Sequence, residues 1–389
     1  MIIELHILQS FPVSNLNRDD VGQPKTATFG GCTRGRISSQ SLKRAARNLF
    51  KEHGLDKSET GVRTKRLLEN AANMLVDAGG DRGKEDAIGV AEAGLRALGF
   101  GVDTETRLTE YLMFVSREAV GLLADFCERN WDSLYKVVTE KRKTAAAKKT
   151  NGEKKTAEKA KKIKPDKETL SEAGRILDAS RVADVALFGR MIADNKDFNV
   201  DAASQVAHAI STHAVANEFD YYTAVDDLKP EAEAGADMIG AVDFNAACYY
   251  RYANLNLGQL SSNLKNDSDL VARTAQAWLY AFIHAVPSGK QNSMAALTMP
   301  HALLGVVRER GSWNLANAFL APVAGGDFLT VSTDKLLHHF KQLRRFYGDS
   351  DIRSVTAASL DGELPHIDAQ EAAVTIDDFA GRVLAAAKA

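Results

Sequence analysis

The sequence has few cysteines, no long apolar run and almost no net charge. Its three cysteines, Cys32, Cys127 and Cys248, lie far apart and form no CxxC pair, which argues against a disulfide framework and a cysteine-rich zinc site. No apolar stretch approaches the roughly 18 residues that a transmembrane helix needs. The amino-terminal MIIELHILQSF contains an acid and a histidine and has no basic lead, unlike a signal peptide. We therefore expect a cytoplasmic protein that does not associate with membranes.

The net charge of −2 conceals an uneven distribution of charged residues. Residues 141–167 contain twelve Lys or Arg and three acids, so this segment carries +9 and the other 362 residues carry −11. The segment has almost nothing to bury, which predicts a solvated, largely disordered insertion. Residues 25–51 contain seven cations and no carboxylate. With 389 residues and 45% apolar content, the chain is long enough for two or three packed units.

The amino-terminal third of the chain combines patterns of a strand, a loop and helices. Residues 1–11 alternate in polarity and predict a strand, and the polar, glycine-containing residues 12–37 predict a long, mobile loop. Ser38 or Ser39 is expected to cap a helix that continues to about residue 51, with an apolar stripe on one side and cations on the other. Helical periodicity from about 60 to 135 predicts an inserted helical subdomain.

The rest of the chain alternates between predicted helices and strands. A helix is expected to resume near Ser171, and two aromatic-rich runs predict a long hairpin over 218–227 and 244–257. Thr375 is expected to cap a last helix, and residues 312–374 are weakly patterned. The remaining predictions are a short buried strand over 182–191, a helix over 204–215 and an amphipathic helix over 270–285.

A basic cluster around the predicted helix start at Ser39 and Gln40 is the strongest candidate site. A helix amino terminus presents free N–H groups and partial positive charge, so cations added there favour repeated phosphates, as in a nucleic-acid backbone. A solvated basic helix face is the alternative, and the absence of any acid over residues 25–51 favours the phosphate site. The cations of this cluster are Arg18, Lys25, Arg34, Arg36, Lys43, Arg44 and Arg47.

Other candidates each have a structural and a functional interpretation. Lys290 follows a glycine but is followed by Gln291, so it is a loop lysine that can contact phosphate and not part of a Walker motif. Met191 is either a core residue or an apolar wedge between bases. Tyr221 and Tyr222 either pack or stack on bases.

Metal and catalytic chemistry has weak support in the sequence. His208 and His213 are five residues apart, which puts them on different sides of a helix, and we interpret both as structural. Asp226 and Asp227 either bind Mg²⁺ for phosphodiester cleavage or lie in a solvent-facing turn, which is the commoner role of such a pair. The Lys-rich residues 141–167 are either an accessory linker or a nonspecific nucleic-acid tail.

Several segments together resemble one family, the CasC-type backbone subunit of the type I-E CRISPR Cascade complex. The similarity covers most of residues 1–300 in order and becomes weak beyond about 300, and the Lys-rich segment is an insertion relative to the family pattern. The segments that carry the resemblance are FPVSNLNRDDVGQPKTATFGG, RISSQSLKRAAR, AHAISTHAVANEFDYYTAVDDL, YYRYANLNLGQL and AVPSGKQNSMAAL.

The resemblance implies an α+β fold shaped like a right hand. It predicts a ferredoxin-like, RRM-related palm, inserted helical fingers and a β-hairpin thumb. The implied divisions are palm at 1–56, 181–214 and 246–389, fingers at 57–180, and thumb at 215–245.

The resemblance also implies a noncatalytic role without cofactor or metal. Subunits of this family stack head to tail along CRISPR RNA, and the thumb of a neighbour displaces a base at intervals. The implied partners are CRISPR RNA, the target DNA strand paired to it, further copies of this chain, and the large, small, 5′-handle-binding and repeat-processing Cascade subunits. The implied RNA contacts are Arg18, Lys25, Ser38, Gln40, Lys43, Arg44, Arg47, Lys290 and Gln291, with Met191, Tyr221 and Tyr222 near the displaced base.

Overall fold

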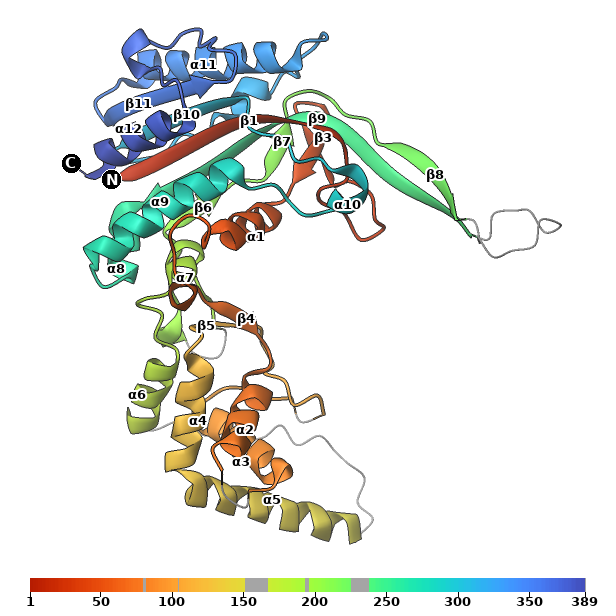
Figure 1. Cartoon of the computed structure of the whole chain (residues 1–389), viewed down its shortest axis with the longest axis vertical. Helices are drawn as coiled ribbons and strands as arrows, with labels where there is room; N and C mark the ends of the chain where they lie inside the picture. Colours follow the sequence, from red (N-terminus) through yellow and green to blue (C-terminus); the bar gives the residue numbers. More distant parts are fainter. Residues whose placement is uncertain (80–81, 104, 151–166, 193–195, 225–237, 389) are drawn as a thin grey trace, which may run out of the picture. The chain divides into compact units, whose positions relative to one another are not determined.

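The structure is a computed structural model that describes residues 1–79, 82–103, 105–150, 167–192, 196–224 and 238–388 (Figure 1). It divides into two compact units. The first contains Met1–Leu55, Ala203–Gly258 and Val271–Ala389, and the second contains Asp56–Ala202 and Gln259–Leu270. Helices combine with an antiparallel sheet, so the predicted α+β class is confirmed, whereas the ferredoxin-like palm and the thumb stay predictions. No described helix is long and apolar enough to cross a membrane.

The first unit is built on one large sheet. Its strands follow the order β11-β10-β1-β9-β7-β3-β2, neighbours run antiparallel, and β6 and β8 also pair with β9. The long strands β1 and β9 are central, so they tie the rest of the sheet together (Figure 1). The strands are β1 (Ile2–Ser14), β2 (Thr26–Phe29), β3 (Cys32–Ile37), β6 (Ser204–Val206), β7 (Ala209–Ser211), β8 (Glu218–Ala224), β9 (Met238–Asn256), β10 (Ala302–Arg308) and β11 (Ile352–Ser359).

Helices cover both faces of this sheet. Successive side chains of a strand point to opposite faces, and Tyr249 and Tyr250 of β9 accordingly belong to different clusters. Tyr250 packs with residues of α11, whereas Tyr249 packs with Ile37 and with Leu42 of α1. The helices of this unit are α1 (Ser39–Leu49), most of α9 (Ser268–His284), α10 (Gln291–Met294), α11 (Phe328–Tyr347) and α12 (Ile376–Lys388), and α8 (Leu257–Asn263) begins in it.

A polar network is buried beneath α11. The Tyr250 hydroxyl accepts a hydrogen bond from the Leu315 N–H at 2.9 Å and forms a second hydrogen bond with His6 Nδ1, also at 2.9 Å. Burial lowers the pKa of His6 to about 3, and the nearby positive charge of Arg308 acts in the same direction. His6 is therefore neutral in the core of the sheet at neutral pH.

The second unit is mainly helical. Helices α2 (Leu67–Asp77), α3 (Lys84–Ala97), α4 (Ala119–Arg129), α5 (Trp131–Thr150) and α6 (Lys167–Ile176) share one apolar core. The remaining elements are α7 (Ala183–Phe188) and the two-stranded sheet of β4 (Val62–Thr64) and β5 (Met113–Val115). The unit begins at Asp56 and continues to Ala202, whereas the sequence placed the end of the fingers at 180.

Part of the predicted disordered insertion is helical. Helix α5 continues through residue 150, and Lys141 and Arg142 on it form ion pairs with Glu92 and Asp86 of α3. The prediction of disorder is therefore wrong for residues 141–150. Residues 151–166 lie outside the described part of the chain.

Three other predictions of local structure are wrong. The segment 182–191 contains helix α7 and not a buried strand, and 204–215 contains strands β6 and β7 and not a helix. The predicted loop over 12–37 contains the hairpin of β2 and β3. The sequence also missed α11 and β11 in the weakly patterned region. The predicted strand at the amino terminus and the helices at 270–285 and after Thr375 are confirmed.

Candidate nucleic-acid interface

Helix α1 begins at a well-defined cap beside the loop that follows β1. The Ser38 hydroxyl accepts a hydrogen bond from the Ser41 N–H at 3.3 Å, as expected of an N-cap. The Ser38 N–H in turn donates to Asn17 Oδ1 at 2.8 Å. Leu42 and Ala46 are buried and hold the helix on the sheet. The positive end of the helix dipole is therefore fixed next to residue 17.

The polar residues of α1 form two neighbouring faces. In an α-helix, residues at spacings of three and seven share a face, and a one-residue offset turns that face by about 100°. One face contains Gln40, which is exposed, and Lys43 and Arg47, which are partly exposed; we call it the outer face. The other contains Ser41, Arg44 and Asn48. The sequence pattern predicts cations opposite the apolar stripe of this helix, but it does not divide them between these two faces.

The loop from Asn15 to Lys25 adds two cations near the helix start. It is folded tightly: the Asp19 side chain accepts hydrogen bonds from the N–H groups of Val21 and Gln23, and the Lys25 N–H donates to the Asn17 carbonyl at 2.8 Å. Arg18 at the start of this turn is exposed, and Lys25 is partly exposed. Both predicted cations are therefore on the surface of the first unit.

Arg34 is not part of the surface cluster. It is fully buried (0% exposed), and its guanidinium donates to the carbonyls of Phe29, Ser211 and Phe319 at 3.2, 2.9 and 2.7 Å. Its predicted contact with RNA is therefore wrong, because its donors hold three parts of the chain together and do not reach solvent. Arg36, two residues later, is partly exposed, and its guanidinium lies 3.1 Å from the His208 ring nitrogen.

The predicted loop lysine lies against the Asn15–Arg18 segment. A side chain at Gly289 would place its Cβ 2.4 Å from the Leu16 carbonyl oxygen, so the close approach of the two loops requires glycine. Lys290 follows with a left-handed backbone (φ 53°) and an exposed side chain. The Gln291 amide donates to the carbonyls of Pro287 and Ala296. Gln291 therefore shapes this loop.

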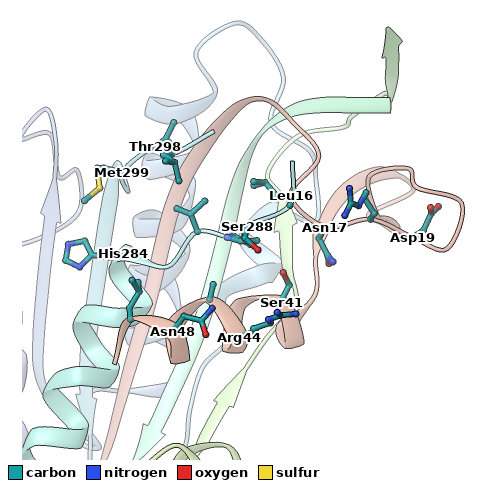
Figure 2. A pocket seen from close by; sticks show the side chains of 17 residues that line it. Leu16, Asn17, Asp19, Ser41, Arg44, Asn48, His284, Ser288, Thr298 and Met299 are labelled. Carbon is teal, nitrogen blue, oxygen red and sulfur yellow. The ribbon is translucent and has the colours of Figure 1, made fainter. Parts of the chain in front are cut away.

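Between these segments lies a groove with a volume of about 620 Å³ (Figure 2). We call it the α1 groove. Arg44 and Asn48 of α1 line it together with His284 and Ser288, which come from the end of α9 and the loop after it. The full lining is Leu16, Asn17, Arg18, Asp19, Ser41, Arg44, Ala45, Asn48, Leu49, His284, Val286, Pro287, Ser288, Gly289, Leu297, Thr298 and Met299.

Most of this lining carries no signal in the sequence. The charge pattern predicts Arg18 and Arg44 as site residues, but it does not indicate the polar groups of Asn48, Ser288 and Thr298. The spacing of Ser41, Arg44 and Asn48 on one helix face was a usable signal, whereas the approach of residues 284–299 depends on the folded chain.

The predicted base-contacting residues lie on other elements. Tyr221 and Tyr222 are exposed on β8, Tyr221 to 67%, and Phe219 packs edge-on against Tyr221. Met191 belongs to the second unit and is 84% exposed, so it is not a core residue. Asp226 and Asp227 lie outside the described residues.

The histidines and acids of the described residues form no metal centre. No three His, Cys, Asp or Glu side chains come together there as ligands of one ion. His213 has a structural role, as predicted, because its Nδ1 donates to the Ala214 carbonyl while Nε2 accepts from the Cys248 N–H. Burial lowers its pKa, which favours this neutral form.

A family model and two solved structures are similar to this chain over nearly its whole length. The model of the family described as CT1975-like protein matches residues 3–381. A chain of a "CRISPR RNA-guided surveillance complex, pre-nicking" has a TM-score of 0.81 and 31% identity, with 100% of both chains covered. A chain of another "CRISPR RNA-guided surveillance complex" has a TM-score of 0.73 and 26% identity, covering 99% of this chain and 100% of that one. No curated protein sequence matches.

Proposed function

This chain belongs to the CT1975-like protein family, and we propose that it is the CRISPR RNA-binding backbone subunit of a Cascade-type surveillance complex. The observation that carries the proposal is the group of cations around the capped start of α1. Lys43 and Arg47 on the outer face, Arg18 and Lys25 in the adjoining loop, and Lys290 all belong to the first unit. Such a surface suits a phosphate backbone.

The proposed contacts explain how one subunit serves any guide. Phosphate contacts fix the register of a strand without reading its sequence. Further copies of the chain would stack head to tail along the RNA, each holding a stretch of backbone. Base pairing between the guide and the target DNA strand then supplies the specificity.

We assign the exposed aromatic residues of β8 to the positions where bases are displaced. Tyr221 and Tyr222 have large exposed rings that can stack on an unstacked base. Met191 offers an exposed apolar side chain that can act as a wedge. Periodic displacement would divide the guide into short segments that pair without winding around a closed filament.

We further propose that the subunit is noncatalytic and uses no metal or cofactor. The competing hypothesis is Mg²⁺-dependent RNA cleavage with Asp226 and Asp227 as ligands. Incubation of the purified protein with RNA and Mg²⁺ tests it: intact RNA is expected. Cleavage that is lost in Asp226→Ala or Asp227→Ala would contradict the proposal.

The direct experiment is to purify the protein from its own host in mild salt and to size and sequence the nucleic acid that copurifies. We expect uniform RNAs, each of one spacer flanked by repeat sequence, together with other Cascade subunits. Heterogeneous RNA, or none, would contradict the proposed role and favour a nonspecific RNA binder.

A further inference from the structure

Arg251 on the central strand β9 is a cation enclosed within the first unit. It is 3% exposed and lies opposite Ile7 of β1 in the strand register. Residues that lie opposite each other on neighbouring strands have their side chains on the same face of the sheet. Helices α1 and α9 cover this face (Figure 1). The guanidinium group is therefore buried between the sheet and two helices.

Two neutral acceptors hold this guanidinium group in place. One terminal nitrogen donates to Gln9 Oε1, and the other donates to the Phe282 carbonyl at 2.5 Å. The Gln9 amide nitrogen donates to the Thr298 carbonyl at 2.6 Å, which fixes the amide with its oxygen toward Arg251. The Arg251 Nε is buried and has no acceptor among the residues that the structure describes. One buried N–H group thus remains for a ligand.

The positive charge of Arg251 is not balanced by a neighbouring acid. Burial lowers its pKa to about 10, so the group stays protonated at neutral pH. In the described part of the chain, no Asp or Glu forms an ion pair with it. By contrast, the buried Arg308 pairs with Glu4, and all three side-chain nitrogens of Arg34 have acceptors. Because a buried charge is costly unless it is paired, Arg251 is suited to an anion.

A small cavity lies beside this side chain. Its volume is about 10 Å³, which is close to the minimum that one water-sized particle needs. Phosphate, sulfate and carboxylate groups have several heavy atoms and are too large for it. The cavity is lined by Leu5, Ile7, Leu42, Val206, Arg251, Tyr252, Ala253 and Phe282.

The lining favours a monatomic anion over water. A buried water needs about two to four polar partners, because its own protons also require acceptors. The side chains beside Arg251 are apolar except for Tyr252, whose hydroxyl donates to Glu4 and accepts from Asn254. A halide ion only accepts hydrogen bonds, so one N–H group and one positive charge suffice to hold it. Apolar walls also suit its weak hydration.

We propose that this cavity binds one chloride ion, which accepts the Nε–H of Arg251 and balances its charge. The ion lies where residues of β1, β9, α1 and α9 meet. Because the site exists only in the folded chain, bound chloride stabilises the first unit. The site is separate from the polar faces of α1 and needs no RNA, so the inference does not rest on the proposed function.

The first experiment follows urea unfolding of the RNA-free full-length protein while chloride replaces gluconate at constant ionic strength. The ratio of folded to unfolded protein should rise saturably, by about tenfold when free chloride is about ten times its Kd. Arg251→Met, which removes the charge, and Ala253→Val, which fills the cavity and keeps Arg251, should each abolish this rise. Arg34→Met is the matched control, because it removes a buried arginine that has its own acceptors; it should lower stability but keep the rise.

The second experiment identifies the occupant and does not depend on the folding of Arg251→Met. Crystals of the unaltered protein are grown with bromide in place of chloride, and diffraction is measured at the bromine absorption edge. An anomalous peak in contact with Arg251 Nε, which is lost in Ala253→Val, is the expected result.

Two results would overturn the proposal. One is a chloride-dependent rise in stability that is equal in the unaltered protein and in Ala253→Val, which would be a general salt effect. The other is the lack of an anomalous peak at Arg251 Nε, which would exclude a halide there. Either result would leave the proposed RNA-binding role unchanged.

Discussion

Replacing Lys43 and Arg47 together by alanine should weaken RNA binding and flatten its dependence on salt. The two side chains lie four residues apart on the outer face of α1. Each phosphate neutralised on a single strand contributes about 0.7 to the slope of log K against log salt. Loss of two contacts should therefore reduce the magnitude of the slope by about 1.4. If the variant and the unaltered protein bind RNA equally at about 1 M salt, the variant should bind about 25-fold more weakly at about 0.1 M salt.

The assay is fluorescence anisotropy of labelled single-stranded RNA over a series of salt concentrations, with thermal unfolding as a check of folding. The matched control is Lys341→Ala with Arg345→Ala. These exposed cations are also four residues apart, on α11 of the same unit, so the net charge changes equally. A double variant with an unchanged slope, or a control that lowers the slope as much, would refute the assignment of phosphate contacts to this face.

Other predictions concern stability and the insertion. Gly289→Ala should cost about 1–3 kcal/mol of unfolding free energy, because its Cβ would meet backbone atoms of the facing loop, whereas Gly326→Ala, with open space, should change it by less than about 0.5 kcal/mol in urea unfolding. Arg34→Met should cost at least about 2 kcal/mol in the same assay, since buried carbonyls lose their donors. The unfolding free energy should fall as pH decreases from about 6.5 toward 3, because unfolded His6 takes up a proton that the folded state excludes; His6→Gln should remove this part of the pH dependence. Deletion of 141–167 should leave assembly on CRISPR RNA intact by size-exclusion chromatography, and lost assembly would make the insertion the main site.

Elements whose signals are local could be predicted from the sequence. Helix α1 has its cap, its buried stripe at Leu42 and Ala46, and its cations within about a dozen consecutive residues. The last helix likewise begins where the Thr375 hydroxyl accepts from the Asp378 N–H. In both cases the hydrogen bonds and the apolar pattern that define the helix come from neighbouring residues.

Elements defined by distant partners could not be predicted in this way. The segment around α7 is buried on all sides, so a short apolar run gave no period that separates helix from strand. Strands β6 and β7 exist because Ser204 and Ile210 pair with Leu255 and Tyr250 of β9. That pairing is formed by residues far along the chain, and it overrides the local helical pattern.

The same distinction applies to the candidate interface. Charge alone predicts a site at the start of α1, which stays a prediction, but it groups the buried Arg34 with the surface cations. Two of the three carbonyls that hold Arg34 belong to residues 177 and 285 positions later in the chain. Nothing near Arg34 in the sequence indicates these two distant acceptors, so its burial is visible only in the folded chain.

The arrangement of α1 leaves two separate polar faces beside its buried stripe. Its buried stripe, with Leu42, Ala46 and the following Phe50, anchors it on the sheet and leaves the remaining circumference polar. Gln40, Lys43 and Arg47 occupy one part of that circumference, and Ser41, Arg44 and Asn48 line the groove on the next. Because neither set belongs to the anchoring stripe, each can be altered without removing the apolar contacts that hold the helix. The proposed role of each polar face of α1 can therefore be tested by substitution without disturbing the other face.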